Sequence, residues 1–328
     1  MVKIAVEVER ALAERAADGV PGRATPRRIA QGEGWTVSDV VCTCGPHDRP
    51  FEEQHASFAI ALVTARSFQY HASHRKLGRS CELMTPGSLL FGQPGQCFEC
   101  KHEHGAGDRC LSFGFSSEYL ERIAIDSGAG SGGFDFGVHL PPLRVLSPLV
   151  ARACAALAAQ GQRSAVFPWE ELGLELAVSV LQLMGGRALE TLEKREIATS
   201  TLARVTRTLR TIEREPGAGH TLATLAREAR LSPYHFLRAF QQVTGVTPHQ
   251  YVLRLRLREA AVRLANEPER ILDIALDCGF GDVSNFNRAF RSEFGSSPRD
   301  FRRKQAAAYH RAAVCAALPE IHLAASMT

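Results

Sequence analysis

The residues with the clearest chemical potential are cysteines and histidines gathered in the first third of the chain. Six of the nine cysteines and six of the twelve histidines fall between residues 42 and 110. Thiolate sulfur and imidazole nitrogen are the ligands that zinc and other soft metal ions prefer. The pattern therefore favours a site for zinc or another soft metal. The densest part of the window supplies the candidate ligands Cys97, Cys100, His102, His104 and Cys110.

Two other interpretations of this cluster remain open. Thiolates react with oxidants and electrophiles, so the cluster is also compatible with redox sensing that involves no bound metal. Free cysteine often behaves as a small buried hydrophobic residue. In that case the signal would be recognised by an unrelated small-molecule pocket.

A second chemical signal is a repeat in the last third of the chain. Eight positions between Phe236 and Tyr251 recur fifty residues later, between Phe286 and Phe301. Such a repeat indicates that one supersecondary unit was built twice, and two copies are too few for a stacked solenoid. Each copy has the pattern of two short helices joined by a tight turn, which is typical of a helix-turn-helix unit. Two such units side by side indicate binding to DNA.

Capping residues place the helices of each copy. Thr221 caps a short helix, Ser232 and Pro233 start the second helix, and Gly245 ends it. The other copy repeats this arrangement with its turn at Gly279. In both copies the second helix buries phenylalanines and leaves a polar face outward. The candidate DNA-contacting residues are Tyr234, His235, Arg238, Gln241, Asp282, Ser284, Asn285, Arg288 and Arg291.

A predicted helix over residues 248–266 joins the two copies. At about 1.5 Å per residue it is roughly 27 Å long. Such a rod can hold two recognition helices about one DNA turn, roughly 34 Å, apart. Four arginines along the rod are expected near phosphates: Arg254, Arg256, Arg258 and Arg263.

This region, from about Thr201 to Lys304, resembles the AraC/XylS family of transcription regulators. The resemblance rests on Gly279-Phe280, Phe286-Asn-Arg-Ala-Phe290 and Gly295-Ser-Ser-Pro298-Arg-Asp-Phe301. It implies that the second helix of each unit reads one of two adjacent major-groove segments. Leu237 stands where many relatives carry a polar residue, which makes base reading by the first unit weaker or more apolar. The implied base readers are Tyr234, His235, Arg238, Ser284, Asn285 and Arg288.

The front half has the pattern of short strands separated by Gly and Pro turns, which predicts an antiparallel barrel or sandwich. The stretch from Met84 to Phe91, followed by Gly95 and histidines, resembles a cupin. That resemblance implies that His102 and His104 share one strand face. The later glutamate of the cupin pattern has no counterpart, which argues against an enzymatic iron or manganese site.

The predicted fold class is α+β. An N-terminal antiparallel, cupin-like β-barrel with flanking helices precedes an all-α domain with two helix-turn-helix units joined by a long helix. The expected divisions are an N-terminal helix and loose segment over 1–34, a cupin-like sensory domain over 35–135, a helical dimerisation and linker region over 136–200, an AraC-type DNA-binding domain over 201–304 and a tail over 305–328.

Charge supports this division. Residues 201–304 hold 18 Lys and Arg against 11 Asp and Glu, a net charge of +7. Residues 1–200 hold 20 against 23, a net charge of −3. A basic module of this kind is expected to bind phosphates in a strongly salt-dependent way. The chain has no run of 18 apolar residues and no apolar core of signal-peptide length at its start. We therefore expect a cytoplasmic protein with no membrane partner.

Together these patterns predict a sequence-specific transcription regulator rather than an enzyme. Its N-terminal domain would sense a small ligand, a metal or a thiol-reactive signal. The expected partners are double-stranded operator DNA, a second copy in a homodimer, and RNA polymerase if the protein activates transcription. The alternative is a methyl-accepting DNA-repair protein or a cupin-type metalloenzyme fused to a DNA-binding module. The spacings Cys42-x-Cys44 and Cys97-x-x-Cys100 do not match the zinc domain of the former.

Overall fold

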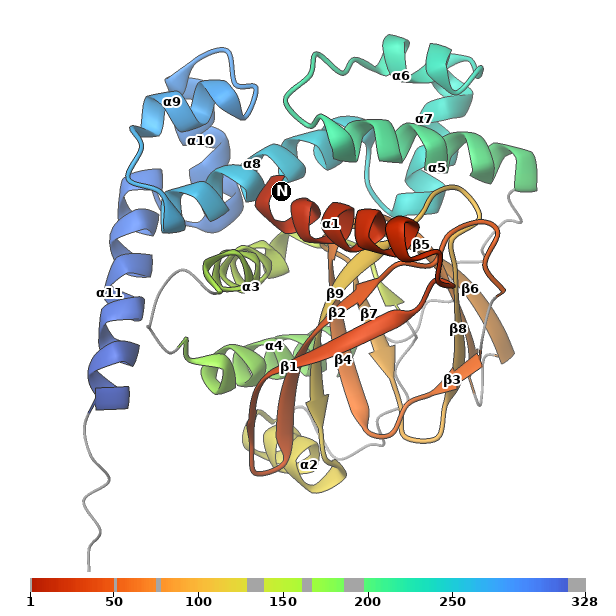
Figure 1. Cartoon of the computed structure of the whole chain (residues 1–328). Helices are drawn as coiled ribbons and strands as arrows, with labels where there is room; N and C mark the ends of the chain where they lie inside the picture. Colours follow the sequence, from red (N-terminus) through yellow and green to blue (C-terminus); the bar gives the residue numbers. More distant parts are fainter. Residues whose placement is uncertain are drawn as a thin grey trace, which may run out of the picture.

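The computed structural model describes residues 2–49, 52–74, 78–128, 139–160, 167–185 and 198–317. It has the predicted α+β architecture, with antiparallel sheets and covering helices first and an all-α part second (Figure 1). No helix among these residues is long and apolar enough to cross a membrane.

The described strands form two antiparallel sheets. The strands are β1 (Ala24–Gly32), β2 (Trp35–Cys42), β3 (Glu52–Gln54), β4 (Phe58–Ala65), β5 (Phe68–His74), β6 (Gly78–Met84), β7 (Leu89–Gly92), β8 (Cys97–Lys101), β9 (Asp108–Phe115) and β10 (His139–Leu140). One sheet has the order β1-β2-β9-β4-β7-β10 and the other β3-β8-β5-β6. Val63, Tyr70 and Met84 belong to a core between the two sheets. The predicted antiparallel sheets are therefore present and pack face to face as a sandwich, while a closed barrel and the cupin resemblance stay predictions.

Four helices cover the other face of the six-stranded sheet. They are α1 (Val2–Asp18), α2 (Ser117–Asp126), α3 (Ser147–Ala159, preceded by the 3₁₀ turn η1, Arg144–Leu146) and α4 (Trp169–Gly185). Strand β4 is buried along most of its length. Because strand side chains alternate between faces, Ile60 and Leu62 point toward these helices while Val63 points into the other core. Figure 1 shows α1, α3 and α4 lying along this sheet.

Two sequence-based expectations are corrected by the structure. The segment expected to be loose contains β1, which pairs with β2 from Ala24↔Cys42 to Gly32↔Trp35. Its residues are mostly exposed or half-buried, so it lacks the hydrophobic alternation by which strands are recognised. The last helix, α11 (Pro298–Ala317), does not stop near Lys304. Alanines 306–308 are strong helix formers and continue it into the expected tail.

The C-terminal part contains two small helical units joined by a rod. Its helices are α5 (Thr199–Arg214), α6 (Leu222–Glu228), α7 (Pro233–Thr244), α8 (Pro248–Asn266), α9 (Ile271–Asp277), α10 (Val283–Phe294) and α11. Phe236 and Phe240 centre the core of the first unit, and Phe286 and Phe290 that of the second. Helix α8 contributes to both cores and joins α6–α7 to α9–α10 across the top of the molecule (Figure 1).

Helix α8 also packs on the N-terminal part. Ala151 and Ala155 of α3 belong to the core of the second unit, where their small side chains allow the two helices to approach closely. Asn266 Nδ2 donates to the Ala155 carbonyl at 3.1 Å. The two halves of the protein therefore share a packed interface centred on α3 and α8.

Candidate nucleic-acid interface and the cysteine–histidine cluster

The structure does not bring the five predicted metal ligands together. Cys97 and Cys100 lie three residues apart on β8, and side chains at odd spacing point to opposite faces of a strand. Cys100 pairs with Tyr70 of β5 and packs against the core between the sheets, whereas Cys97 pairs with Gln54 of β3. His102 and His104 follow the end of β8 in a turn, so they do not share a strand face as the cupin resemblance implied.

A different group of ligand-type side chains does converge, and it includes His102. Cys42, His102 and Asp108 are all buried, and their potential ligand atoms lie within 4.8 Å of one another. His102 Nε2 is 2.6 Å from Asp108 Oδ1, and the Cys110 thiol donates to Asp108 Oδ2 at 3.5 Å. Sequence spacing missed Cys42 and Asp108 because only the β2–β9 pairing makes them neighbours.

The thiols around this group differ in their acidity. An interaction with the Cys42 thiol lowers the pKa of Cys44, and the nearby His102 adds to this effect. The same pair interaction, together with burial, raises the pKa of Cys42. Burial also raises the pKa of Cys100 and Cys110 well above the ordinary thiol value. Of Cys42 and Cys44, Cys44 therefore has the more readily ionised thiol, whereas Cys100 and Cys110 are held neutral in the core.

The recognition helices of the two C-terminal units begin and end in the same way. Ser232 accepts from the His235 amide at 3.3 Å, and Asp282 accepts from the Asn285 amide at 2.7 Å. Both helices end at a glycine in the left-handed conformation, with φ of 74° at Gly245 and 70° at Gly295. The caps expected from sequence are thus present, and both helices have 12 residues.

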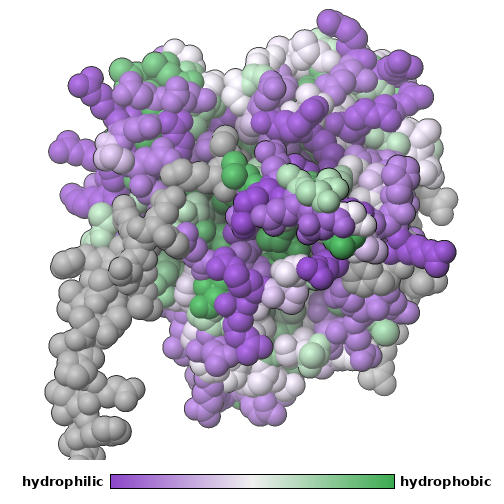
Figure 2. Space-filling model, viewed as in Figure 1, coloured by the Kyte–Doolittle hydropathy of each residue, from purple (hydrophilic) through white to green (hydrophobic). Residues whose placement is uncertain are grey.

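The outer faces of α7 and α10 are exposed. Tyr234 is 62% exposed, and Arg238 lies over its ring with Nη1 donating to the hydroxyl at 3.1 Å. His235 Nδ1 shares a hydrogen bond with the capping Ser232 hydroxyl at 2.8 Å. All nine predicted DNA-contacting residues are exposed, with Asp282 also serving as an N-cap. Hydrophilic side chains cover much of the surface over the C-terminal helices, apart from a hydrophobic patch over α9 that includes Leu272 and Leu276 (Figure 2).

Comparison with known proteins agrees with this geometry. Residues 225–304 match the family model described as a helix-turn-helix domain. The activator RhaS of Klebsiella pneumoniae (strain 342) is 38% identical over 107 residues, which are 33% of this chain and 38% of that protein. The C-terminal part of the chain thus carries a DNA-binding domain of the AraC/XylS type, as the sequence predicted. The chain spans less than half of the length of this relative.

Two solved structures are similar to parts of this chain. The DNA-binding domain of AdpA in complex with a target DNA is 26% identical, with a TM-score of 0.31, and the match covers 32% of this chain and 94% of that one. ToxT of Vibrio cholerae strain SCE256 is 11% identical, with a TM-score of 0.31, and covers 84% of this chain and 96% of that one. RhaS is a transcriptional activator and AdpA a global transcriptional factor, which is the class of protein that the sequence predicted.

The arginines along α8 of the AraC/XylS domain do not lie where the sequence suggested. Arg256 donates to the carbonyls of Pro216 at 2.6 Å and Gly279 at 2.8 Å, which ties the two units together. Arg263 pairs with Glu267, Glu269 and Asp277. Arg254 pairs with Glu293, and Arg258 is only 5% exposed. These four side chains brace the fold from within, so their charge is not free to meet phosphates.

The interface between the halves also contains a buried acid. Burial raises the pKa of Glu213 on α5 to about 7, although Arg210 opposes this shift. The Tyr251 hydroxyl donates to Glu213 Oε1 at 2.8 Å. Arg210 in turn donates to the Ser67 carbonyl at 2.6 Å, across the boundary between the AraC/XylS domain and the sheets.

Proposed function

We propose that this protein is a sequence-specific DNA-binding transcription regulator. The observation that supports the proposal best is the duplicated unit, in which α7 and α10 have matching caps, matching ends and exposed polar faces. A helix with one buried apolar stripe and one polar face fits the major groove, where side chains reach the base edges.

The joining helix supports reading of two successive groove segments. Helix α8 has 19 residues, which corresponds to a rod of roughly 28 Å at about 1.5 Å per residue. Arg256 and the shared cores fix the two units relative to each other. We propose that Tyr234, His235, Arg238 and Gln241 contact one segment. Ser284, Asn285, Arg288 and Arg291 contact the next, while Asp282 orients α10.

The charge distribution supports the same function. The net charge of +7 over residues 201–304 is not neutralised by the net −3 of residues 1–200. Because α8 uses its arginines internally, the phosphate-facing charge must come from the exposed arginines of the recognition helices and their neighbours. These include Arg291, which is not among the implied base readers.

Binding by the purified full chain tests this proposal. A DNA site is first selected from a random pool, and its affinity is compared with that of a scrambled duplex by fluorescence anisotropy over a range of salt concentrations. We expect specific binding to exceed non-specific binding by roughly 10³-fold or more, and both to weaken as salt rises. Equal affinity for the selected and scrambled duplexes would refute sequence-specific reading.

We further propose that the N-terminal part is sensory and acts through the interface with α8. Glu293 of α10 accepts a hydrogen bond from Ser147 and forms ion pairs with Arg144 and Arg254. A ligand can favour one arrangement of the halves only if it binds that arrangement more tightly. A homodimer, contact with RNA polymerase and a cytoplasmic location belong to this proposal on the family resemblance.

A further inference from the structure

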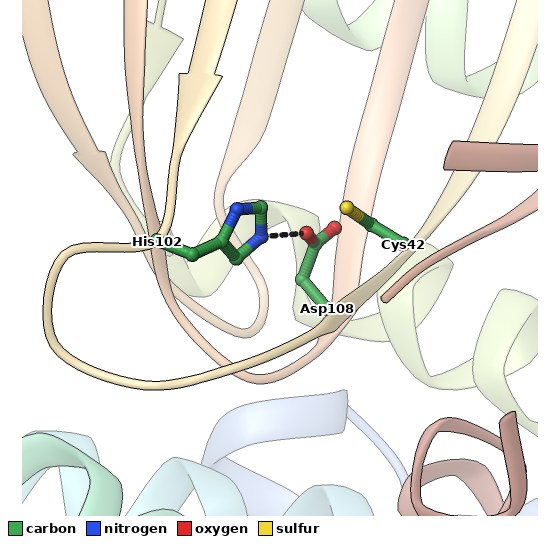
Figure 3. A group of neighbouring side chains, drawn as sticks. All are labelled: Cys42, His102 and Asp108. Carbon is green, nitrogen blue, oxygen red and sulfur yellow. Dashed lines mark hydrogen bonds and ion pairs between the residues drawn. The ribbon is translucent and has the colours of Figure 1, made fainter. Parts of the chain in front are cut away.

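One end of the two-sheet domain brings together three buried side chains of the types that bind metal ions. Cys42 ends β2 and Asp108 begins β9, and the two are direct partners in the antiparallel register. Directly opposed residues project to the same face of a sheet. The turn after β8 then places His102 against them, so three segments supply one side chain each (Figure 3).

These three side chains form a compact buried group. Cys42, His102 and Asp108 are each exposed by 5% or less. One carboxylate oxygen of Asp108 meets His102 Nε2, and Figure 3 shows the other oxygen near the Cys42 sulfur. Cys44 adds a second buried thiol, and its amide donates to Cys42 Sγ at 3.4 Å. Burying a polar group is costly unless it finds a partner, and here the polar groups face one another.

We infer that Cys42, His102 and Asp108 form a binding site for a soft divalent metal ion of the zinc type, which a movement of the neighbouring Cys44 side chain would complete with a fourth ligand. Two sulfurs, one imidazole nitrogen and one carboxylate oxygen match the ligand types of four-coordinate zinc sites. The set shares only His102 with the one that sequence spacing suggested. Metal binding would release the thiol protons, because metal ligands must be deprotonated. It would also replace the short His102–Asp108 contact, because both side chains would then bind the metal.

The position of this site links it to the C-terminal domain. Residues 102–107 connect His102 to the strand that begins at Asp108, and Ala106 within them accepts from Arg210 Nη1 at 3.4 Å. Arg210 also holds the Ser67 carbonyl, at the start of β5. A small cavity between the two halves has His102, His104, Thr206 and Arg210 among its lining residues. Metal bound to His102 and Asp108 would therefore order a turn that touches α5. The metal site does not rest on the proposed function, but the role of metal binding as a signal to the DNA-binding units does.

Cobalt titration of the reduced, chelator-treated full chain tests the site directly. We expect one Co²⁺ per chain, with a near-ultraviolet thiolate-to-cobalt band and the visible bands of tetrahedral cobalt, all displaced by Zn²⁺. This measurement needs no variant. A wild-type protein that shows no thiolate band on titration would overturn the inference.

Variants separate the two possible ligand sets. Loss of a residue that only hydrogen-bonds to a metal ligand weakens metal binding by roughly 10- to 100-fold. Cys42→Ser and Asp108→Asn remove ligands themselves, so they are expected to weaken Co²⁺ binding by more than this. Cys97→Ser is expected to bind like the wild type. Circular dichroism establishes which variants are folded, and only folded ones are compared. Loss of the band in Cys97→Ser, with retention in folded Asp108→Asn, would contradict the assignment.

Hydrogen exchange tests the link to α5. Zinc is expected to slow amide exchange in residues 102–107 and in α5 of the wild type. Arg210→Ala is expected to keep the cobalt spectrum and the slowing in the turn, but to lose the slowing in α5. Unchanged exchange in α5 of zinc-bound wild type would refute the link while leaving the metal site intact.

Discussion

Arg230 and Gly279 occupy equivalent positions in the turns of the two helix-turn-helix units, and both have a left-handed backbone, with φ of 53° and 86°. In each unit the residue that follows donates its amide back to the first helix. Leu231 donates to the Ala226 carbonyl at 3.0 Å, and Phe280 donates to Ala275 at 3.1 Å. The two turns thus leave the first helix with the same backbone geometry, but only one has the residue type that this geometry favours.

Gly279→Ala is predicted to destabilise the second unit. A side chain would adopt an unfavourable φ, and its Cβ would lie 2.6 Å from the Gly217 carbonyl oxygen, which is backbone and cannot rotate away. The expected loss in free energy of unfolding is about 1–3 kcal/mol. Thermal unfolding measures it, with Gly219→Ala as the control because a Cβ there meets no neighbouring atom. Equal melting temperatures for the two variants would contradict this account.

Arg230→Gly is predicted to change the free energy of unfolding in the opposite direction to Gly279→Ala. Glycine relieves the left-handed strain at Arg230, although it also gains freedom in the unfolded chain. The net change should lie between neutral and about 1 kcal/mol of added stability. Arg227→Gly, in the exposed part of α6, is the matched control and should lose about 1 kcal/mol. Similar losses in both variants would show that Arg230 is not strained.

Glu213→Gln is predicted to remove part of the pH dependence of stability. The pKa of Glu213 is raised to about 7 in the folded protein because burial disfavours its charged form. The stability that the protonated Glu213 carboxyl contributes is therefore complete below its pKa in the unfolded chain, about 4.5. It is lost as the pH rises from there through 7. We expect the variant to match the wild type near pH 5 and to exceed it at pH 8, by up to about 3 kcal/mol.

Urea unfolding at the two pH values measures this difference. The exposed Glu215→Gln serves as the control, since it makes the same chemical change two residues away without removing a buried carboxyl. A Glu213→Gln variant that is less stable than the wild type at pH 8 would show that the charged carboxylate stabilises the interface instead.

Asp39→Asn is predicted to be strongly destabilising. Burial alone would raise the pKa of Asp39, but hydrogen bonds and charge from Arg109 and Arg27 outweigh it and lower the pKa. Arg109 Nε and Nη2 each donate to this carboxylate at 2.8 Å. Removing the charge leaves Arg109 buried without its counterion, at a cost of about 3–5 kcal/mol. Thermal unfolding against the exposed Asp126→Asn checks this, and equal melting temperatures would refute it.

Arg288→Ala is predicted to weaken specific binding much more than non-specific binding. If Arg288 makes a bidentate contact with a guanine, its loss costs about 1–3 kcal/mol, or roughly 5- to 150-fold in affinity for the selected site. Arg28→Ala removes the same charge from an exposed position on β1. Fluorescence anisotropy compares both variants on selected and scrambled DNA. A parallel fall on the two duplexes would make Arg288 a phosphate contact rather than a base reader.

The helical units could be predicted well because their signals are local. Thr221, Ser232 and Gly245 cap or end helices within a few residues of the positions where they act. The same local logic failed for the arginines of α8. Nothing in their spacing reveals that Arg256 faces the Pro216 and Gly279 carbonyls, which only the tertiary fold brings near.

The cysteine–histidine cluster was only partly predictable for a related reason. The sequence drew attention to the right window and to His102. Strand pairing then decides which of its neighbours lie close, and it joins Cys42 to Asp108 across 65 intervening residues. The Cys-x-x-Cys spacing, which suits a turn, lies within a strand and separates its two thiols.

We propose that two units of one chain read two adjacent major-groove segments. Guanine methylation interference on a selected site tests it most directly, because arginine contacts guanine at N7 and O6 in that groove. We expect two clusters of interfering guanines about 10 base pairs apart, on one face of the duplex. The Arg288→Ala variant should lose sensitivity in one cluster only. A single cluster, or interfering guanines spread evenly along the site, would contradict reading by both α7 and α10.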